Sequence, residues 1–137
     1  KGLQKQIMDS LGSKGEHRIS EWLTNKGYLI LERNWRTRTG EIDIIALDKT
    51  EQNSSGEVLV FVEVKTLLKT ELSDLDLIIN KKKQERIIKT AKHFLVNNRK
   101  YNKMYIRFDV VVLRSNPFLE QPLEILHLKD AFGDCYD

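Results

Sequence analysis

Two short stretches of this 137-residue sequence carry ionisable side chains where a structural strand would hold valine or isoleucine. Asp43 interrupts the apolar run 40–46, and Glu63 with Lys65 interrupts the run 58–65. Because side chains alternate along a strand, Glu63 and Lys65 share one face. If the two strands form a hairpin, both carboxylates and the ammonium converge. Buried charges of this kind need partners, a metal ion or solvent.

The chemistry that fits these groups is metal-dependent hydrolysis of phosphodiesters. Asp43, Glu63 and the backbone carbonyl of Val64 offer the hard oxygen ligands that Mg²⁺ or Mn²⁺ accepts. Such an ion activates a water molecule and stabilises the charge that develops in the transition state. Lys65 lies two positions from a ligand and could orient that water or help to remove its proton. An acid-x-lysine pair is common on exposed strands and is weak evidence alone. The position of Glu63 and Lys65 within an apolar run favours a functional role more strongly than an exposed pair would.

Other chemistries find little support in the sequence. His17, His93 and His127 are scattered without ligand spacing, and we expect structural roles for them. The sequence contains no glycine-rich phosphate loop and no G-x-S-x-G motif. Cys135 is the only cysteine, which favours a reducing compartment. Because no apolar run reaches about 18 residues, we expect a cytoplasmic protein without a membrane span.

Basic residues are concentrated in one segment although the net charge is only +3. Residues 81–107 contain ten lysines and arginines against one acid, whereas residues 116–137 contain five acids against one lysine. Solvated helices usually mix both signs, so this imbalance favours a polyanionic partner. The side chains expected to contact nucleic acid are Lys82, Lys83 and Arg86 on a helix and Arg36 and Arg38 in a turn.

The first element that must position the acidic groups is a helix over 14–26. Its apolar stripe contains Ile19, Trp22 and Leu23, and Gly12 is expected to separate it from a weaker helical pattern nearer the N-terminus. Glu16 lies on or beside this stripe and points towards whatever the helix packs on. An acid in the first turn is also favoured by the helix dipole alone, so both interpretations of Glu16 stand.

The remaining elements are five strands and a second helix. We expect strands over 28–34, 41–47, 58–66 and 105–113, a helix over 79–98, and a further edge strand over 123–128. Continuous apolar runs indicate strands that are buried on both faces. The order helix, three strands, helix, strand therefore predicts one three-layer α/β domain over 1–137 with a central mixed sheet.

Several motifs together resemble the YraN family of bacterial proteins, over roughly residues 12–114. The residues that carry the resemblance are Gly15-Glu16, Asn34-Trp35-Arg36, Gly40-Glu41-Ile42-Asp43, Phe61-Val62-Glu63-Val64-Lys65 and Arg107-Phe108-Asp109-Val110. This family is similar to PD-(D/E)XK nucleases and archaeal Holliday-junction resolvases. The resemblance implies a restriction-endonuclease-like core over about 13–114, followed by a C-terminal extension over 115–137.

The resemblance also implies roles for individual residues. Asp43 would be the first metal ligand, Glu63 and Lys65 the E-x-K pair, and Glu16 an additional acid that approaches the same metal. Lys83 and Gln84 would lie near the site at the start of the second helix and contact the substrate. Related sequences commonly have a basic residue after E-x-K-Thr, whereas Leu67 follows here. The loop 48–57 and the extension after residue 115 also look longer than the family pattern.

The leading functional hypothesis is a Mg²⁺- or Mn²⁺-dependent endonuclease that hydrolyses DNA, including branched or junction DNA. A resolvase of this kind would act as a homodimer. A second hypothesis is a non-catalytic nucleic-acid-binding module on a nuclease scaffold. A third is a structural or protein-interaction domain in which Asp43, Glu63 and Lys65 form an ordinary ion-pair cluster. The choice between DNA and RNA is left open by the sequence.

Overall fold

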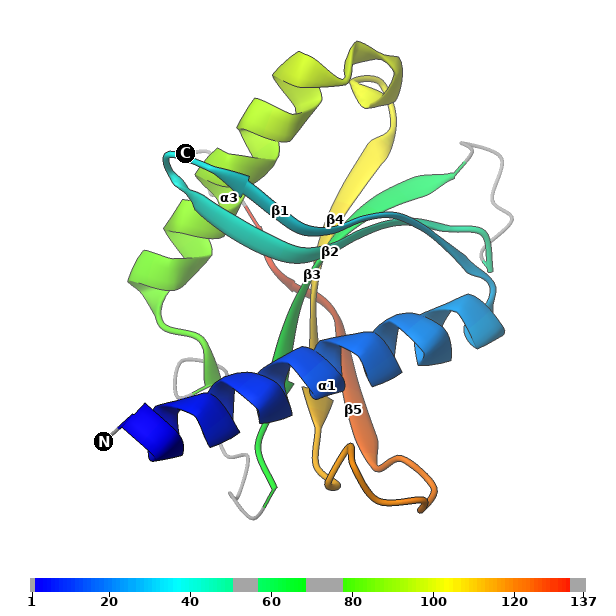
Figure 1. The fold of residues 1–137 in the computed structure, drawn as a ribbon. Coiled ribbons are helices and arrows are strands. Elements are labelled where there is room, and N and C mark those ends of the chain that lie inside the picture. Colours follow the sequence, from blue (N-terminus) through cyan, green and yellow to red (C-terminus); the bar gives the residue numbers. More distant parts are fainter. Residues whose placement is uncertain (1, 51–56, 69–77, 134–137) are drawn as a thin grey trace.

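The computed structural model describes residues 2–50, 57–68 and 78–133. Along the chain the described elements are α1 (Gly2–Lys26), β1 (Tyr28–Thr37), β2 (Gly40–Asp48), β3 (Val58–Thr66), α3 (Lys81–Asn97), the 3₁₀ helix η1 (Arg99–Tyr101), β4 (Tyr105–Leu113) and β5 (Ile125–Phe132) (Figure 1). The strands form one five-stranded mixed sheet in the order β1-β2-β3-β4-β5. Only β3 and β4 are parallel, because α3 lies between them as a crossover.

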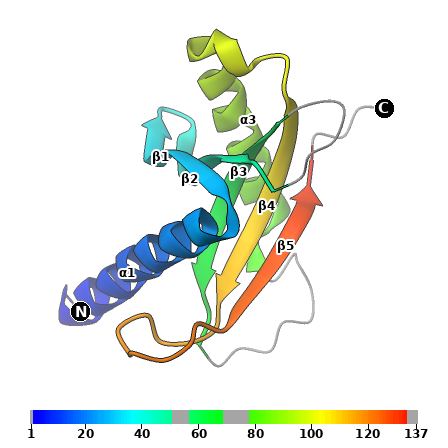
Figure 2. The ribbon, with the colours of Figure 1, turned by 90° about the vertical axis from the view of Figure 1, so that its right-hand side faces the viewer.

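The helices cover opposite faces of the sheet, so the predicted three-layer mixed α/β architecture is confirmed (Figure 2). On the α1 side, Ile19 and Leu23 pack with strand residues such as Val60. On the α3 side, Phe94 packs with Phe61 at 5.8 Å between ring centroids. Strand β3 is buried on both faces, which explains why its sequence is a continuous apolar run rather than an alternating one.

The predicted break at Gly12 is wrong, since α1 runs without interruption from residue 2 to residue 26. A glycine inside a helix costs only about 1 kcal/mol relative to alanine, and helix propagation from both sides exceeds that cost. The predicted end of the helix is confirmed at Gly27, whose φ of 104° favours glycine. The further edge strand predicted over 123–128 is present as β5, in antiparallel pairing with β4.

Some predicted segments fall partly outside the described residues. Residues 51–56 of the predicted loop 48–57 and residues 134–137 of the C-terminal extension, including Cys135, are among them. Within the described part of the chain, no helix combines the length and the hydropathy needed to cross a membrane.

Candidate functional site

The candidate site lies where β2 and β3 separate, and we call this point, at Asp43 and Glu63, the fork. Their ladder ends at the pair Ile44–Val62, and Asp43 and Glu63 are the residues just beyond it. Ile42 packs on the α3 side of the sheet and Ile44 on the α1 side, so the regular alternation is interrupted at Asp43. Instead of a backbone carbonyl of β2, the Asp43 carboxyl oxygen Oδ2 accepts a hydrogen bond from the Val64 N–H at 2.8 Å.

Glu16 reaches this fork from the other side, on α1. A close approach of the helix to β3 makes this possible, because a Cβ added to Gly15 would collide with the hydroxyl of Thr66. Asn34, with its amide nitrogen facing the carboxylates, donates to Glu16 Oε2 at 2.7 Å. Its φ of 52° is a left-handed conformation that asparagine tolerates better than most residues. The structure therefore brings together Glu16, Asp43 and Glu63.

The acidic groups influence one another electrostatically. Burial raises the pKa of Asp43 far above its usual range, and a hydrogen bond with Glu63 and the negative charges of Glu63 and Glu16 raise it further. Burial also raises the pKa of Glu16, although a hydrogen bond with Asp43 opposes that shift. A proton is therefore retained on Asp43 at neutral pH, since the protein supplies too little positive charge for all three groups to ionise together.

Glu63 is the most enclosed of the three, with 4% of its side chain exposed. Lys83 Nζ lies 3.1 Å from Glu63 Oε2. The angles of this contact do not meet hydrogen-bond geometry, however, and Oε2 has no hydrogen-bond partner in the described part of the chain. The Lys83 contact is therefore a Coulombic pairing that leaves a buried lone pair of Glu63 available to another cation.

Lys65 projects on the same face of β3 as Glu63 and is partly exposed. Among the described residues it has no hydrogen-bond or ion-pair partner, so its ammonium is free to contact a bound molecule. In a strand, the N–H and C=O of a residue point to the same side. Because the Val64 N–H points to Asp43, the Val64 carbonyl also faces the fork.

These donors fit a hard divalent cation. The Asp43 and Glu63 carboxyl groups and the Val64 carbonyl are oxygen ligands of the type that Mg²⁺ prefers, and Glu63 Oε2 is the unpartnered buried oxygen such an ion would satisfy. Within residues 2–50, 57–68 and 78–133, no three acidic, histidine or cysteine side chains are arranged as a complete metal cage. Glu16 shares a hydrogen bond with Asp43 and accepts one from Asn34, so it lies beside these candidate ligands.

Three of the predicted basic residues, Lys82, Lys83 and Arg86, lie in the first two turns of α3. Lys82 and Arg86 are exposed on α3. The turn between β1 and β2, which carries Arg38, packs on the same helix through a hydrogen bond of 3.0 Å between the hydroxyls of Thr39 and Thr90 (Figure 1). Arg36 is exposed and forms an ion pair with Glu41 at 3.1 Å. Helix and turn together therefore present a basic surface.

Gln84, which the resemblance places at the substrate, lies inside the fold, and Trp35 is partly buried. Gln84 is buried, and its amide nitrogen donates to the Ile79 carbonyl at 3.0 Å, which fixes the start of α3. Trp35 packs edge-on against Phe94 at 5.2 Å between ring centroids. Gln84 is therefore omitted from the basic surface, which consists of Lys82, Lys83, Arg86, Arg36 and Arg38.

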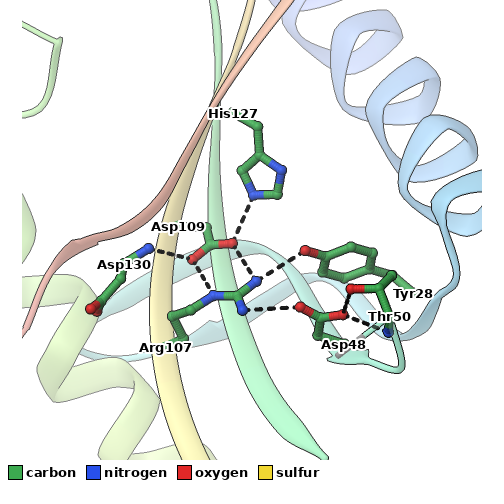
Figure 3. A network of polar contacts seen from close by, with 7 residues as sticks. All are labelled: Tyr28, Asp48, Thr50, Arg107, Asp109, His127 and Asp130. Atoms are coloured by element: carbon green, nitrogen blue, oxygen red, sulfur yellow. Dashed lines mark hydrogen bonds and ion pairs between the residues drawn. The ribbon is translucent and has the colours of Figure 1, made fainter. Parts of the chain in front are cut away.

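Sequence reasoning missed a second polar cluster, on the α1 side of the sheet (Figure 3). Arg107 forms two hydrogen bonds of 2.9 Å with Asp109 and one of 3.0 Å with Asp48. It also donates to Tyr28 Oη at 3.0 Å, and His127 Nε2 lies 2.7 Å from the second oxygen of Asp109. The same-face pair Arg107-x-Asp109 was the available signal, but the sequence alone did not supply Asp48 and His127 as partners.

Charge is balanced in this second cluster. Burial alone would raise the pKa of Asp48, but hydrogen bonds from Thr50 and Arg107 hold it below its usual range. The pKa of Asp109 is likewise lowered, because hydrogen bonds from His127, Arg107 and the Asp130 backbone outweigh the effect of burial. Burial raises the pKa of Tyr28 to about 12. Every ionised group in the cluster has a partner, so it is a structural network.

Comparison with known proteins identifies the family. The model of Uncharacterised protein family UPF0102 matches residues 15–113. A UPF0102 protein of Treponema denticola is 92% identical over 130 residues, covering 95% of this chain and 100% of that protein. A UPF0102 protein of Treponema pallidum is 52% identical over 124 residues, covering 90% and 93%, and one of Clostridium botulinum is 40% identical over 122 residues, covering 89% and 93%. The chain therefore belongs to the UPF0102 family, which is the YraN family that its motifs resemble.

Proposed function

We propose that this protein is a divalent-metal-dependent nuclease with a PD-(D/E)XK-type core that hydrolyses DNA. The observation that carries the proposal is the pair Asp43–Glu63 at the parting of two buried strands. Burial and the neighbouring Glu63 raise the pKa of Asp43, and Glu63 Oε2 has no hydrogen-bond partner within the described residues. Strongly perturbed acids beside an unpartnered lysine are typical of functional sites.

Asp43, Glu63 and the Val64 carbonyl would hold Mg²⁺ or Mn²⁺. When bound, the ion supplies Lewis-acid stabilisation of the phosphate and lowers the pKa of a water molecule. The protein's own residues prepare this step. Asp43 gives up its proton to become a ligand, and Lys65 orients the attacking water or stabilises charge on the phosphate. Glu16, held by Asn34, keeps negative charge next to Asp43 and so favours cation binding.

The fold and the basic surface support the assignment without being specific to it. A mixed sheet with helices on both faces is compatible with a nuclease core. The phosphates would be contacted by basic residues of α3, of the end of β1 and of the turn that follows it, namely Lys82, Lys83, Arg86, Arg36 and Arg38. We extend the proposal, on the family resemblance, to branched or junction DNA cut by a homodimer and to a cytoplasmic location.

The decisive experiment measures Mg²⁺-dependent cleavage of linear, single-stranded and four-way-junction DNA. Asp43→Asn and Lys65→Met are each expected to abolish cleavage, because one loses a ligand charge and the other the free ammonium. Lys103→Met serves as the control, since Lys103 is an exposed lysine far along the chain from the fork. If both site variants cut as fast as the wild-type protein, the proposed active site is wrong.

A second candidate function is a nucleic-acid-binding module without catalysis. The ion pair of Lys83 with Glu63 favours it, because it neutralises Glu63 without a metal. Binding to DNA that persists in EDTA, together with no detectable Mn²⁺ binding at millimolar concentration, would support this alternative. The salt dependence of DNA binding does not discriminate, because both functions use the same basic surface.

A further inference from the structure

The contact between Lys83 and Glu63 joins the basic surface to the carboxyl groups at the fork. The backbone of Lys83 is fixed, because its N–H donates to the Asn80 side chain that caps α3, at 2.9 Å. Its side chain spans from this cap to Glu63 Oε2. Lys83 is 41% exposed and Glu63 only 4%, so a solvated ammonium reaches a buried carboxylate.

This pairing differs from an ion pair that stabilises the fold. Lysine presents a compact point charge on a flexible stem, whereas a structural pair gains from fixed, directional hydrogen bonds. The ammonium is within ion-pair distance of Oε2 but does not satisfy it as a hydrogen-bond donor. Because 41% of the Lys83 side chain is exposed, the ammonium can leave Glu63 for solvent without a large change in its free energy.

We propose that Lys83 is an internal substitute for the divalent cation, and that it couples metal binding to nucleic-acid binding. A metal ion on Glu63 and the Lys83 ammonium compete for the same carboxylate, so the lysine lowers metal affinity in the free protein. A phosphate on the basic surface draws Lys83 away from Glu63 and leaves that carboxylate to the metal. By linkage, the metal must strengthen nucleic-acid binding by the same factor. Lys83 is thus a positioning residue, and this inference rests on the proposed function.

The consequence is a site that assembles fully only on its substrate. Without nucleic acid, Glu63 is neutralised by a lysine of the same chain and the ion is held weakly. With nucleic acid, Lys83 joins Lys82 and Arg86 on the phosphates, and the ion is held tightly beside them. Free metal-loaded enzyme is thereby kept scarce.

The test is a Mn²⁺ titration, followed by the EPR signal of free Mn²⁺, with and without a short DNA duplex. Lys83→Met is expected to bind Mn²⁺ about 5- to 50-fold more tightly than wild type without DNA, and to lose most of the strengthening caused by DNA. Lys89→Met is the matched control, because it removes the same charge from an exposed position of the same helix that lies outside the basic surface. It should leave Mn²⁺ affinity within about twofold of wild type. Lys83→Arg keeps the charge and should retain weak Mn²⁺ binding in the absence of DNA.

The outcomes separate this inference from the function on which it rests. If wild type binds Mn²⁺ and Lys83→Met binds it equally or more weakly, the inference is overturned and the nuclease proposal stands. If neither protein binds Mn²⁺, with or without DNA, the proposed metal site itself is wrong and the inference falls with it. Tighter binding by Lys83→Met but not by Lys83→Arg supports the inference and shows that charge, not disturbed folding, is responsible.

Discussion

The sheet contains two groups of buried acids whose surroundings shift their pKa values in opposite directions. Asp48 and Asp109 both meet Arg107, whose guanidinium hydrogen-bonds to each of them, and their pKa values are lowered. Asp43 and Glu63 meet each other, and the pKa of Asp43 is raised. Strand β2 contributes an acid to each group, Asp48 to one and Asp43 to the other, so the strand of origin is not what distinguishes them.

The two groups differ in how the negative charge of their carboxyl groups is neutralised. A carboxylate that receives a bidentate arginine contributes to a rigid, uniquely packed fold. Asp43 meets the carboxyl group of Glu63 and no arginine, its pKa is raised, and such a cost persists in a fold when the group has a task to perform. The comparison therefore assigns the Arg107 cluster to stability and the Asp43–Glu63 pair to chemistry.

The most direct test of this comparison removes the positive charge of Arg107. Arg107→Met keeps an unbranched apolar stem but removes the guanidinium, so Asp48 and Asp109 stay buried without their common partner. We expect the free energy of unfolding to fall by about 3–5 kcal/mol, measured by urea denaturation. Lys103→Met, an exposed change on the same segment, should stay within about 0.5 kcal/mol. A loss equally small for Arg107→Met would contradict the structural role.

The affinity of the Asp43–Glu63 site for a divalent ion should depend on pH through the protonation of Asp43. Since Asp43 retains a proton at neutral pH, binding of a divalent ion must release it. The affinity for Mn²⁺ is expected to rise about tenfold per pH unit between about pH 6 and 8, equivalent to about 1.4 kcal/mol per unit. Calorimetric titrations in buffers of different ionisation enthalpy measure the released proton. An affinity independent of pH would show that Asp43 is not a ligand or is already ionised.

Asp43→Asn should stabilise the metal-free protein by about 0.5–2 kcal/mol at pH 8, because the neutral amide removes the cost of keeping a buried carboxyl protonated at that pH. The sign follows from linkage. A carboxyl whose folded pKa is raised contributes stability that is present below its unfolded pKa and is lost as pH rises towards the folded pKa. The advantage of the variant should therefore grow from about pH 4 upwards, as urea denaturation across pH would record. If Asp43→Asn were less stable than wild type at every pH, the conclusion that Asp43 destabilises the metal-free protein would be wrong.

The smallest expected effect on stability belongs to Lys65. Because Lys65 has no ion-pair or hydrogen-bond partner among the described residues, Lys65→Met should change the free energy of unfolding by less than about 0.5 kcal/mol. Thermal denaturation of the variant checks this value, with Lys103→Met again as the reference. A loss comparable to that of Arg107→Met would mean that Lys65 belongs to the fold and not to the site.

The sequence could predict the core of the site because its signals are local. Asp43, Glu63 and Lys65 stand out as charges in apolar strands, and strand alternation places Lys65 beside Glu63. The three-layer fold also follows from local patterns, since buried strands and amphipathic helices differ in period. The position of Glu16 on the helix left its role open and the family resemblance supplied it, and its approach to Asp43 depends on the close contact of Gly15 with Thr66.

The sequence could not predict features that depend on long-range geometry. Gln84 looks like a surface residue of a basic helix, yet the loop before α3 supplies a carbonyl that takes its amide inside. The Arg107 cluster requires Asp48, His127 and Tyr28 to meet from separate strands, which depends on sheet order and register. The expected break at Gly12 applied a local rule where helix continuity was decisive.

The hydrogen bond from Val64 N–H to Asp43 affects which residues are expected to persist as sequences related to this protein diverge. Asp43 completes the backbone bonding of β3 where β2 departs, so a lineage that lost catalysis would still benefit from an acceptor at this position. Lys65 has no comparable structural duty, and mutation would be free to erase it. Across relatives, a lysine at position 65 should therefore report retained activity more faithfully than an aspartate at position 43.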